Sequence, residues 1–259
     1  MYKNILAFIF ILTISLPIGA QQLQDDQSRI DRGEDRNVLY RNEGTFGVYI
    51  HTHGGLGLSY RRGQHVSGTR KRMLEIEAQN FKHPKEVKTV NPIYDNAKGF
   101  VYGKLNSFLI LRPGVGFQNT LYQKGDKKSV EIRMSYFLGA DLTFAKPTYL
   151  EVIYKRGALE TPTIATERYV PGTYNDTVSN VYGKASFFRG MEKTTIHPGL
   201  YAKLAFSFEY ADRYNRIKAI ETGAVVDAYP WELPMMAHQK NQQVYVQLYL
   251  KMIWGKKWF

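Results

Sequence analysis

Cysteine is absent from the 259 residues, and tryptophan is scarce, with three residues. The lack of cysteine excludes a disulfide framework, a thiolate metal site, a thiol nucleophile and a lipid-anchored N-terminal cysteine. After residue 20 no uncharged apolar run reaches the length of a membrane-spanning helix. A mean hydropathy of −0.37 likewise excludes a bundle of membrane helices. What is abundant is tyrosine (19), phenylalanine (14) and glycine (22), a composition that favours strands because aromatic side chains suit a pleated surface.

The first twenty residues are typical of a cleaved export signal. Lys3 provides a short positive region, residues 5–18 are almost wholly apolar, and Ile18-Gly19-Ala20 forms an acceptable cleavage site. An apolar run of about 15 residues is short of the roughly 20 residues that a membrane anchor needs. We therefore predict a signal peptide over residues 1–20, then a flexible polar segment over residues 21–42 (rather than a docking arm), and a single domain over residues 43–259.

Residues 130–144 alternate strictly between apolar and polar or small side chains. Successive side chains of a strand face opposite sides, so each alternate set reports one environment. One set is Val130, Ile132, Met134, Tyr136, Leu138, Ala140, Leu142 and Phe144, and the other is Glu131, Arg133, Ser135, Phe137, Gly139, Asp141 and Thr143. A strand of this length is unusual for an ordinary soluble domain.

The same alternation recurs in seven further segments, so we predict eight strands. The other seven cover residues 46–51, 56–61, 74–79, 111–121, 200–209, 220–228 and 244–254. Val225 interrupts the polar set of its segment. A count of ten follows instead if residues 148–154 pair with part of residues 182–188.

The facing of the two sets distinguishes two fold classes. In a soluble sandwich the apolar set points inward, whereas in an outer-membrane barrel it meets lipid and the polar set fills the interior. The export signal, the long strands and the mixture of glycine with paired charges favour the barrel, and closure also removes exposed sheet edges. We predict an all-β protein, a closed antiparallel up-and-down transmembrane β-barrel.

Connection lengths support eight strands independently. With both ends of the barrel domain on the periplasmic side, the first, third, fifth and seventh connections face outward. The third (about 81–108) and the fifth (about 144–199) are the longest, so both lie on the outer side, as the asymmetry of short turns and long loops requires. The turns near residues 63–70, 123–128 and 211–215 are shorter and polar.

The chain resembles small outer-membrane β-barrel proteins, in particular a poorly characterised type found in Bacteroidota. The resemblance covers everything after the signal and is carried by the eight segments, by Phe259 at the end, and by residues 111–118 (LRPGVGFQ), 146–152 (KPTYLEV) and 197–203 (HPGLYAK). It implies an outer-membrane address and names no activity. One departure is that Gly255-Lys256-Lys257 separates Trp254 from the terminal Trp258-Phe259, whereas the usual assembly signal ends a strand directly on the aromatic residue.

The polar set predicts a charge network inside the barrel. Its acids are Glu75, Glu77, Glu131, Asp141, Glu209, Glu221 and Asp227, and its bases are Arg61, Arg112, Arg133, Lys203 and Lys251. Such a network either forms an ion or proton path or fills the lumen structurally. We favour the structural role, because an eight-stranded barrel is just wide enough for side chains and buried ions need partners.

Catalytic, cofactor and metal sites are not indicated. His51 and His53 share a strand face, but no third ligand lies at a diagnostic spacing. Gly54-Gly55-Leu56-Gly57 precedes a strand rather than a helix, so it indicates a hairpin and not a phosphate loop. An enzyme acting on lipid A or phospholipid needs a hydroxyl, an imidazole and a carboxylate together. The final strand has neither serine nor histidine, and no Gly-x-Ser-x-Gly occurs.

Charge and loops suggest the partners. The formal net charge is +12, yet no aromatic-basic module for nucleic acid accompanies it. We expect the basic residues near the third strand to contact anionic lipid headgroups instead; they are Arg70, Lys71, Arg72, Lys82, Lys85 and Lys88. The fifth connection offers a candidate interaction surface composed of Tyr182, Phe187, Phe188, Arg189 and Met191.

These observations predict a non-enzymatic barrel of the Gram-negative outer membrane, exported by a cleaved signal and closed to solutes. It acts through its extracellular loops as a structural or accessory component of the envelope. Its partners are then outer-membrane lipid and lipopolysaccharide, the barrel-insertion machinery and an envelope-complex protein. The alternatives are an accessory subunit of a secretion or envelope-assembly complex, and an enzyme that modifies lipid A or phospholipid.

Overall fold

The computed structural model describes residues 41–94, 96–124, 129–154, 163–172, 180–211, 215–237 and 239–259. The predicted signal peptide and nearly all of the predicted polar segment lie outside these residues. Within them, no helix is both long and apolar enough to cross a membrane.

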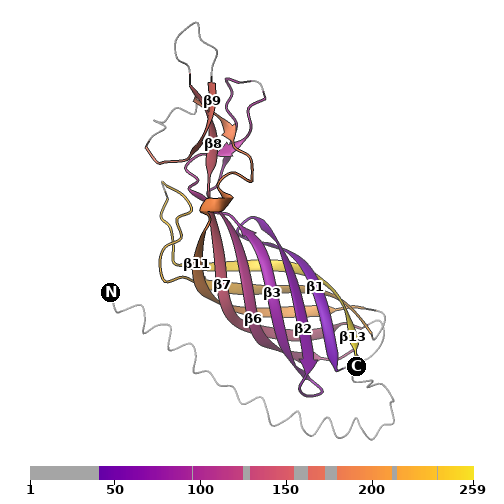
Figure 1. Ribbon diagram of the computed structural model, residues 1–259. Helices are drawn as coiled ribbons and strands as arrows, with labels where there is room; N and C mark the ends of the chain where they lie inside the picture. The colour runs from indigo at the N-terminus through magenta and orange to yellow at the C-terminus, as the bar shows by residue number, and fades with distance from the viewer. Residues whose placement is uncertain are drawn as a thin grey trace, which may run out of the picture. The chain divides into compact units, whose positions relative to one another are not determined.

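Eight long strands close into an antiparallel barrel (Figure 1), which confirms the predicted class and strand count. They are β1 (Asn42–His51), β2 (Gly55–His65), β3 (Arg70–Phe81), β6 (Asn106–Tyr122), β7 (Glu131–Pro147), β11 (Thr195–Glu209), β12 (Arg216–Ala228) and β13 (Val244–Trp258). Neighbours in sequence are neighbours in the wall, and β1 pairs with β13 to close it.

The pairing that would have raised the count to ten exists, but it lies outside the barrel. Strand β8 (Tyr149–Tyr154) pairs with β10 (Val181–Lys184) on one side and with β9 (Thr163–Arg168) on the other. The three form a sheet of their own, because β7 pairs directly with β11 and leaves no gap in the wall. The described residues also include a two-stranded ribbon of β4 (Lys88–Thr89) and β5 (Phe100–Val101) and the 3-10 turn η3 (Met191–Lys193).

The apolar set faces outward, as the alternation predicted. Leu138 is 65% exposed in the middle of β7. Its neighbour Gly139 faces inward, where an added Cβ would lie 2.2 Å from the carbonyl oxygen of Pro113 and 2.7 Å from the ring of Tyr201. Val225, which breaks the polar set of β12, is buried in the lumen. It joins a cluster of Tyr49, Met73, Phe137, Tyr201, Ala205, Val225 and Tyr249, so the interior is not purely polar.

The connections sort by length between the two barrel ends. One end, here called the loop end, carries the connections 52–54, 82–105, 148–194 and 229–243, and the other, the turn end, carries 66–69, 123–130 and 210–215. Both longest connections therefore leave the same end, as predicted. This arrangement follows from the antiparallel order of the strands.

The last strand corrects one expectation. Gly255, Lys256 and Lys257 do not interrupt it, because β13 continues to Trp258 and stops directly before Phe259. The extension is possible because β1 starts early enough to pair with it, Thr45 lying opposite Gly255 and Asn42 opposite Trp258. The apparent departure from the assembly signal is therefore absent.

Candidate functional site

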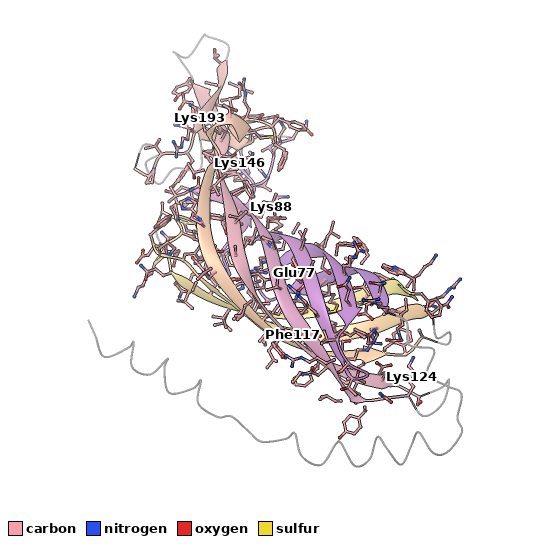
Figure 2. The ribbon with its side chains drawn as sticks, turned by 60° about the horizontal axis from the view of Figure 1, so that its bottom comes forward. Glu77, Lys88, Phe117, Lys124, Lys146 and Lys193 are labelled. Atoms are coloured by element: carbon pink, nitrogen blue, oxygen red, sulfur yellow. The ribbon has the colours of Figure 1, made fainter. Side chains whose placement is uncertain are left out.

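The predicted interior charge network exists and lies in the barrel lumen. All of its members except Glu131 are at most 3% exposed, and the Glu131 side chain is 15% exposed. The buried members are Arg61, Glu75, Glu77, Arg112, Arg133, Asp141, Lys203, Glu209, Glu221, Asp227 and Lys251. Figure 2 shows Glu77 within the barrel, between Lys124 near the turn end and Lys146 near the loop end.

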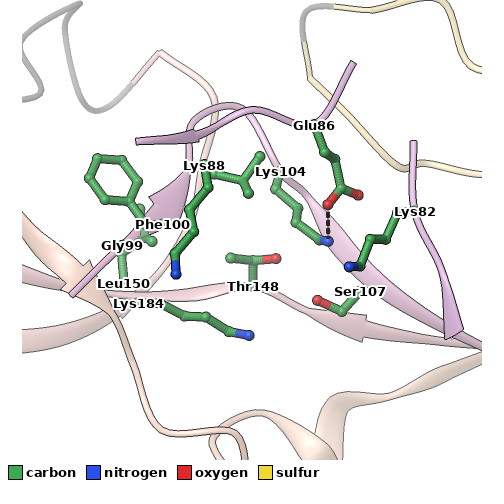
Figure 3. Close-up of a pocket in the computed structure, with 11 residues that line it drawn as sticks. Lys82, Glu86, Lys88, Gly99, Phe100, Lys104, Ser107, Thr148, Leu150 and Lys184 are labelled. Atoms are coloured by element: carbon green, nitrogen blue, oxygen red, sulfur yellow. Dashed lines mark hydrogen bonds and ion pairs between the residues drawn. The ribbon is translucent and has the colours of Figure 1, made fainter. Parts of the chain in front are cut away.

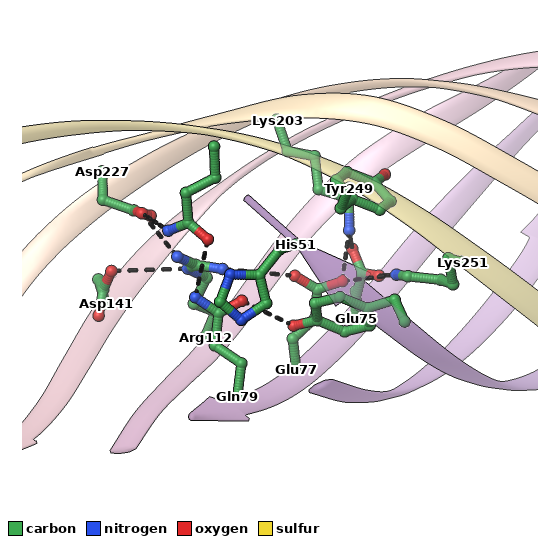
Figure 4. Close-up of polar contacts among 12 residues, drawn as sticks. His51, Glu75, Glu77, Gln79, Arg112, Asp141, Lys203, Asp227, Tyr249 and Lys251 are labelled. Atoms are coloured by element: carbon green, nitrogen blue, oxygen red, sulfur yellow. Dashed lines mark hydrogen bonds and ion pairs between the residues drawn. The ribbon is translucent and has the colours of Figure 1, made fainter. Parts of the chain in front are cut away.

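At the centre two lysines bind two carboxylates (Figure 4). Lys203 Nζ lies 2.6 Å from Glu75 Oε2 and 2.7 Å from Glu77 Oε1. Lys251 Nζ contacts the same two residues at 3.2 and 2.6 Å. Each lysine therefore bridges both acids, and neither acid depends on a single partner.

A bidentate pair adjoins this centre. The guanidinium of Arg61 donates to both oxygens of Glu221 at 2.5 Å and to Glu75 Oε1 at 2.6 Å. The Tyr249 hydroxyl donates to Glu221 at 2.7 Å. With Lys203 and Lys251, three cations then face three carboxylates, so the central layer is formally neutral and its ions are paired, as burial in a low dielectric requires.

A second layer lies nearer the loop end and centres on Arg112. Its guanidinium lies 2.6 Å from Asp227 Oδ2 and 3.6 Å from Asp141 Oδ2. The hydroxyl of Tyr229 donates to Asp141 at 2.7 Å. Gln247 donates at 2.5 Å to the same oxygen of Asp227 that Arg112 binds, so the layer combines ions with neutral hydrogen-bonding groups.

A third layer lies at the turn end and includes two residues that the sequence analysis did not assign to the lumen. Arg133 binds Glu209 and also Glu131, the latter at 2.6 Å. Glu43 accepts from Lys71 at 2.5 Å, and both side chains are at most 4% exposed. The placement of Lys71 among lipid-facing bases was wrong, because β3 begins at Arg70 rather than near Leu74, and alternation then turns Lys71 inward with Glu75.

The ion pairs cross the lumen more than they follow the strand ladder. Some pairs do join neighbouring strands, as Arg112 of β6 does with Asp141 of β7. Lys203 of β11 instead binds acids of β3, although β7 and β6 lie between these two strands along the wall. Because long side chains from opposite walls meet in the centre, the network holds the wall together across its diameter.

The seventh connection folds into the barrel mouth at the loop end. Leu233, Met235 and Met236 are 0%, 1% and 7% exposed and pack against inward side chains of the strands, including Phe81 and Phe108. Backbone bonds fix the segment to the third connection, from Leu105 N to Met235 O (2.9 Å) and from Ala237 N to Gly103 O (2.8 Å). The apolar run of residues 233–236 was the available signal for this plug, and the sequence analysis missed it.

The predicted interaction surface is partly brought together. Phe187 and Phe188 are 61% and 75% exposed and meet edge to face with centroids 5.7 Å apart. Lys146 of β7 donates to the carbonyls of Phe187 (2.5 Å) and Arg189 (3.3 Å). Met191, 50% exposed, bonds back to Phe188. This group lies next to the barrel rim, whereas Tyr182 packs its ring against Tyr94.

His51 and His53, the two histidines that share a strand face, contact the backbone and an aromatic ring. His51 Nε2 lies 3.0 Å from the carbonyl oxygen of Asn80, and His53 stacks on Phe81 with ring centroids 4.6 Å apart. Across the described ranges no three His, Asp or Glu side chains gather as a metal-binding group.

A pocket of about 330 Å³ lies among the loops beyond the barrel. It is lined by the third connection, the start of β6, the residue that follows β7 and the small sheet. The lining residues are Lys82, Glu86, Lys88, Gly99, Phe100, Val101, Lys104, Ser107, Thr148, Leu150 and Lys184. Figure 3 shows its four lysines arranged around Thr148. Lys82 and Lys88 were predicted to contact lipid headgroups, and the structure places them in this pocket.

Comparisons with known proteins give a fold likeness only. No family model matches the chain, and no curated protein matches it. Among solved structures it is similar to Neisserial surface protein A, with 9% identity and a TM-score of 0.38, over 84% of this chain and 94% of the other. It is also similar to the attachment invasion locus protein Ail of Yersinia pestis, with 8% identity and a TM-score of 0.38, over 83% and 95%. A second Ail structure holds the heparin analogue sucrose octasulfate and gives 6% and 0.37, over 83% and 95%. Likeness at this level establishes neither a shared family nor a shared function.

Proposed function

We propose that this chain is a non-enzymatic integral barrel of the outer membrane, closed to solutes, whose loop end faces outward and binds other envelope or extracellular components. The observation that carries the proposal is the inverted distribution of side chains. Leucines such as Leu56 (66% exposed) and Leu200 (69%) form the outer surface, while Lys251 and Glu221 are fully buried inside. A soluble domain would have the reverse arrangement, and lipid is the solvent that suits an apolar wall.

Two features that fill the lumen support its closure to solutes. The central layer places Lys203 and Lys251 between Glu75 and Glu77, and the plug of residues 233–236 covers the mouth above it. An interior filled by paired charges resists ion passage, because an entering ion must replace partners that are already satisfied. The long connections at the loop end are then the parts of the molecule available for recognition.

The membrane assignment is tested by fractionation. We expect the protein to remain in the pellet after sodium carbonate extraction of isolated envelopes. It should also migrate differently on a gel before and after heating, because a closed barrel resists detergent until heated. Release of the protein into the carbonate supernatant would contradict the proposal.

The proposal extends to export, assembly and origin. Residues 1–20 are proposed to direct export and to be cleaved, and the insertion machinery is proposed to recognise β13 and Phe259. Outer-membrane lipid and lipopolysaccharide surround the apolar wall. We also propose, on the sequence resemblance alone, that the chain is a small barrel of the Bacteroidota type.

A role as an accessory subunit of a secretion or envelope-assembly complex is the second candidate, favoured by the exposed pair Phe187 and Phe188. A protein partner would bury both rings. We expect the double variant Phe187→Ser/Phe188→Ser to fold normally and to lose any protein that co-purifies from membranes in mild detergent. Ile93→Ser, at another exposed loop position (61%), is the matched control and should retain it.

A further inference from the structure

The loop pocket concentrates positive charge with little to neutralise it. Four lysines and one glutamate line it, a formal excess of three positive charges. Glu86 is bound to Lys104 at 2.6 Å. Among the residues that the structure describes, the side-chain ammonium groups of Lys82, Lys88 and Lys184 have no hydrogen-bond or ion-pair partner, although their backbones are bonded. These three ammonium groups therefore line a pocket in which a bound anion could pair with them.

The neighbouring lysines affect the pKa of Lys104. Burial lowers its pKa, and the charges of Lys184 and Lys82 lower it further, whereas Glu86 raises it. Neighbouring ammonium groups thus lie close enough to repel one another, and an anion placed among them would relieve the repulsion.

A buried hydroxyl marks the same pocket. Thr148 is 8% exposed, yet its Oγ1 has no hydrogen-bond partner. Its backbone is fully used, the amide donating to Leu105 O and the carbonyl accepting from Tyr169 N, both at 2.9 Å. A buried hydroxyl without a partner is costly, and a ligand oxygen in the pocket would satisfy it.

The backbone places Lys88 beside a glycine. Lys88 and Val101 pair in the β4–β5 ribbon, and the Lys88 side chain lies across Gly99, where an added Cβ would approach Lys88 Cε to 2.2 Å. A larger residue at position 99 would displace the end of the Lys88 side chain from this path. From the other side, Lys184 pairs with Leu150 at the edge of the small sheet, so the cationic groups come from two different sheets.

We propose that this pocket binds a small organic phosphate the size of a single sugar ring, with Lys88, Lys184 and Lys104 on the phosphate and Thr148 on an oxygen of the ligand. Lysine acts as a point charge that suits phosphate. A volume of about 330 Å³ is at the small end of the range for small-molecule sites, and Phe100 and Leu150 provide an apolar wall for the ring. The proposal rests on the proposed function, which turns this end of the barrel outward.

Binding is tested by isothermal titration calorimetry of the full chain in detergent micelles, with glucose 6-phosphate as the probe and glucose as its neutral counterpart. We expect glucose 6-phosphate to bind, glucose to show no heat of binding, and the affinity to fall as salt is raised, because the contacts are electrostatic. Equal behaviour of the two sugars would overturn the proposal.

Charge-reversal variants distinguish binding in the pocket from non-specific attraction to the positive charge of the protein. Lys88→Glu and Lys184→Glu should each lower the affinity for glucose 6-phosphate at least tenfold. Lys193→Glu, an exposed lysine of η3 outside the pocket, should change it less than twofold. An equal loss in all three variants would indicate a non-specific charge effect and contradict the site.

Thr148→Val is the most discriminating variant. Because Oγ1 has no partner in the protein, its removal should leave thermal stability unchanged or higher, yet weaken glucose 6-phosphate binding at least threefold. Unchanged affinity in a folded Thr148→Val protein would remove the hydroxyl from the site and overturn its proposed role.

A sugar phosphate reaches this pocket either as a soluble ester or as the phosphorylated sugar of a lipopolysaccharide headgroup. Competition distinguishes the two sources. If phosphorylated lipopolysaccharide displaces glucose 6-phosphate and its dephosphorylated form does not, the headgroup is the source. If neither displaces it, the source is soluble.

Failure of the pocket and failure of the membrane assignment give different results. If the protein resists carbonate extraction but does not bind glucose 6-phosphate, the membrane assignment stands and the proposed binding site is wrong. If the protein binds glucose 6-phosphate but is released by carbonate, the binding site stands and the membrane assignment, with its outward-facing loop end, is wrong.

Discussion

Lys203 reaches across the lumen from β11 to Glu77 of β3, with 2.7 Å between Nζ and Oε1, although two strands, β7 and β6, separate them along the wall. Lys251 of β13 binds the same oxygen at 2.6 Å. The carboxylate of Glu77 therefore connects three strands of the barrel, β3, β11 and β13. Because the contact crosses the interior, it constrains the diameter of the barrel and not only the register of adjacent strands.

Removal of Lys203 should destabilise the barrel strongly. Lys203→Met leaves Glu75 and Glu77 with fewer cations in a buried site, and breaking such a pair costs about 3–5 kcal/mol. We expect a lower free energy of unfolding in urea, measured by tryptophan fluorescence in lipid vesicles. Adding Glu77→Gln should recover part of the loss. Additive effects of the two substitutions would show that the pair is not coupled.

The outward facing of Leu138 gives a second prediction. Leu138→Arg places a charge against the membrane core and should lower the stability of the inserted state by about 2–4 kcal/mol. Val66→Arg is the matched control, since Val66 is equally exposed (64% against 65%) but lies in a turn beyond the strands. Equal folding of both variants into vesicles would mean that Leu138 does not face lipid.

Gly139 gives a third prediction on the opposite face of the same strand. Gly139→Ala would bring a Cβ to 2.2 Å from the carbonyl oxygen of Pro113, and backbone cannot yield as a flexible side chain can. Overpacking of this kind costs about 1–3 kcal/mol. Gly68→Ala, with nothing within 4 Å of its Cβ, should leave the urea midpoint unchanged. A tolerated Gly139→Ala would show that the wall at this point is not closely packed.

The fourth prediction concerns conductance. In planar lipid bilayers the purified protein should give no stable conductance steps, because the Arg112 layer and the central layer both fill the lumen. A deletion of residues 233–236 should remain silent for the same reason, since the charge layers lie beneath the plug. Large, stable, ion-passing steps from the parent protein would contradict a closed barrel.

The alternation of side chains determined the barrel from the sequence alone. A period of two is a local property of each strand. It places Leu138 on the outside and turns Glu131, Arg133 and Asp141 toward the interior. The strand count and the side of the long loops also follow, because antiparallel order fixes which end each connection leaves. The sequence therefore specified the wall and the identity of most lumen residues.

Contacts between distant segments were decided only by the tertiary structure. The partnership of Lys203 with Glu77 depends on which residues face each other across a closed barrel, and the alternation of one strand carries no information about the opposite wall. Lys71 was misplaced because the start of β3 is set by pairing with β2, where Lys71 lies opposite His65. The pocket around Thr148 likewise depends on loops folding together, because its lysines at positions 82, 88, 104 and 184 are far apart in the chain and only tertiary packing brings them to one cavity.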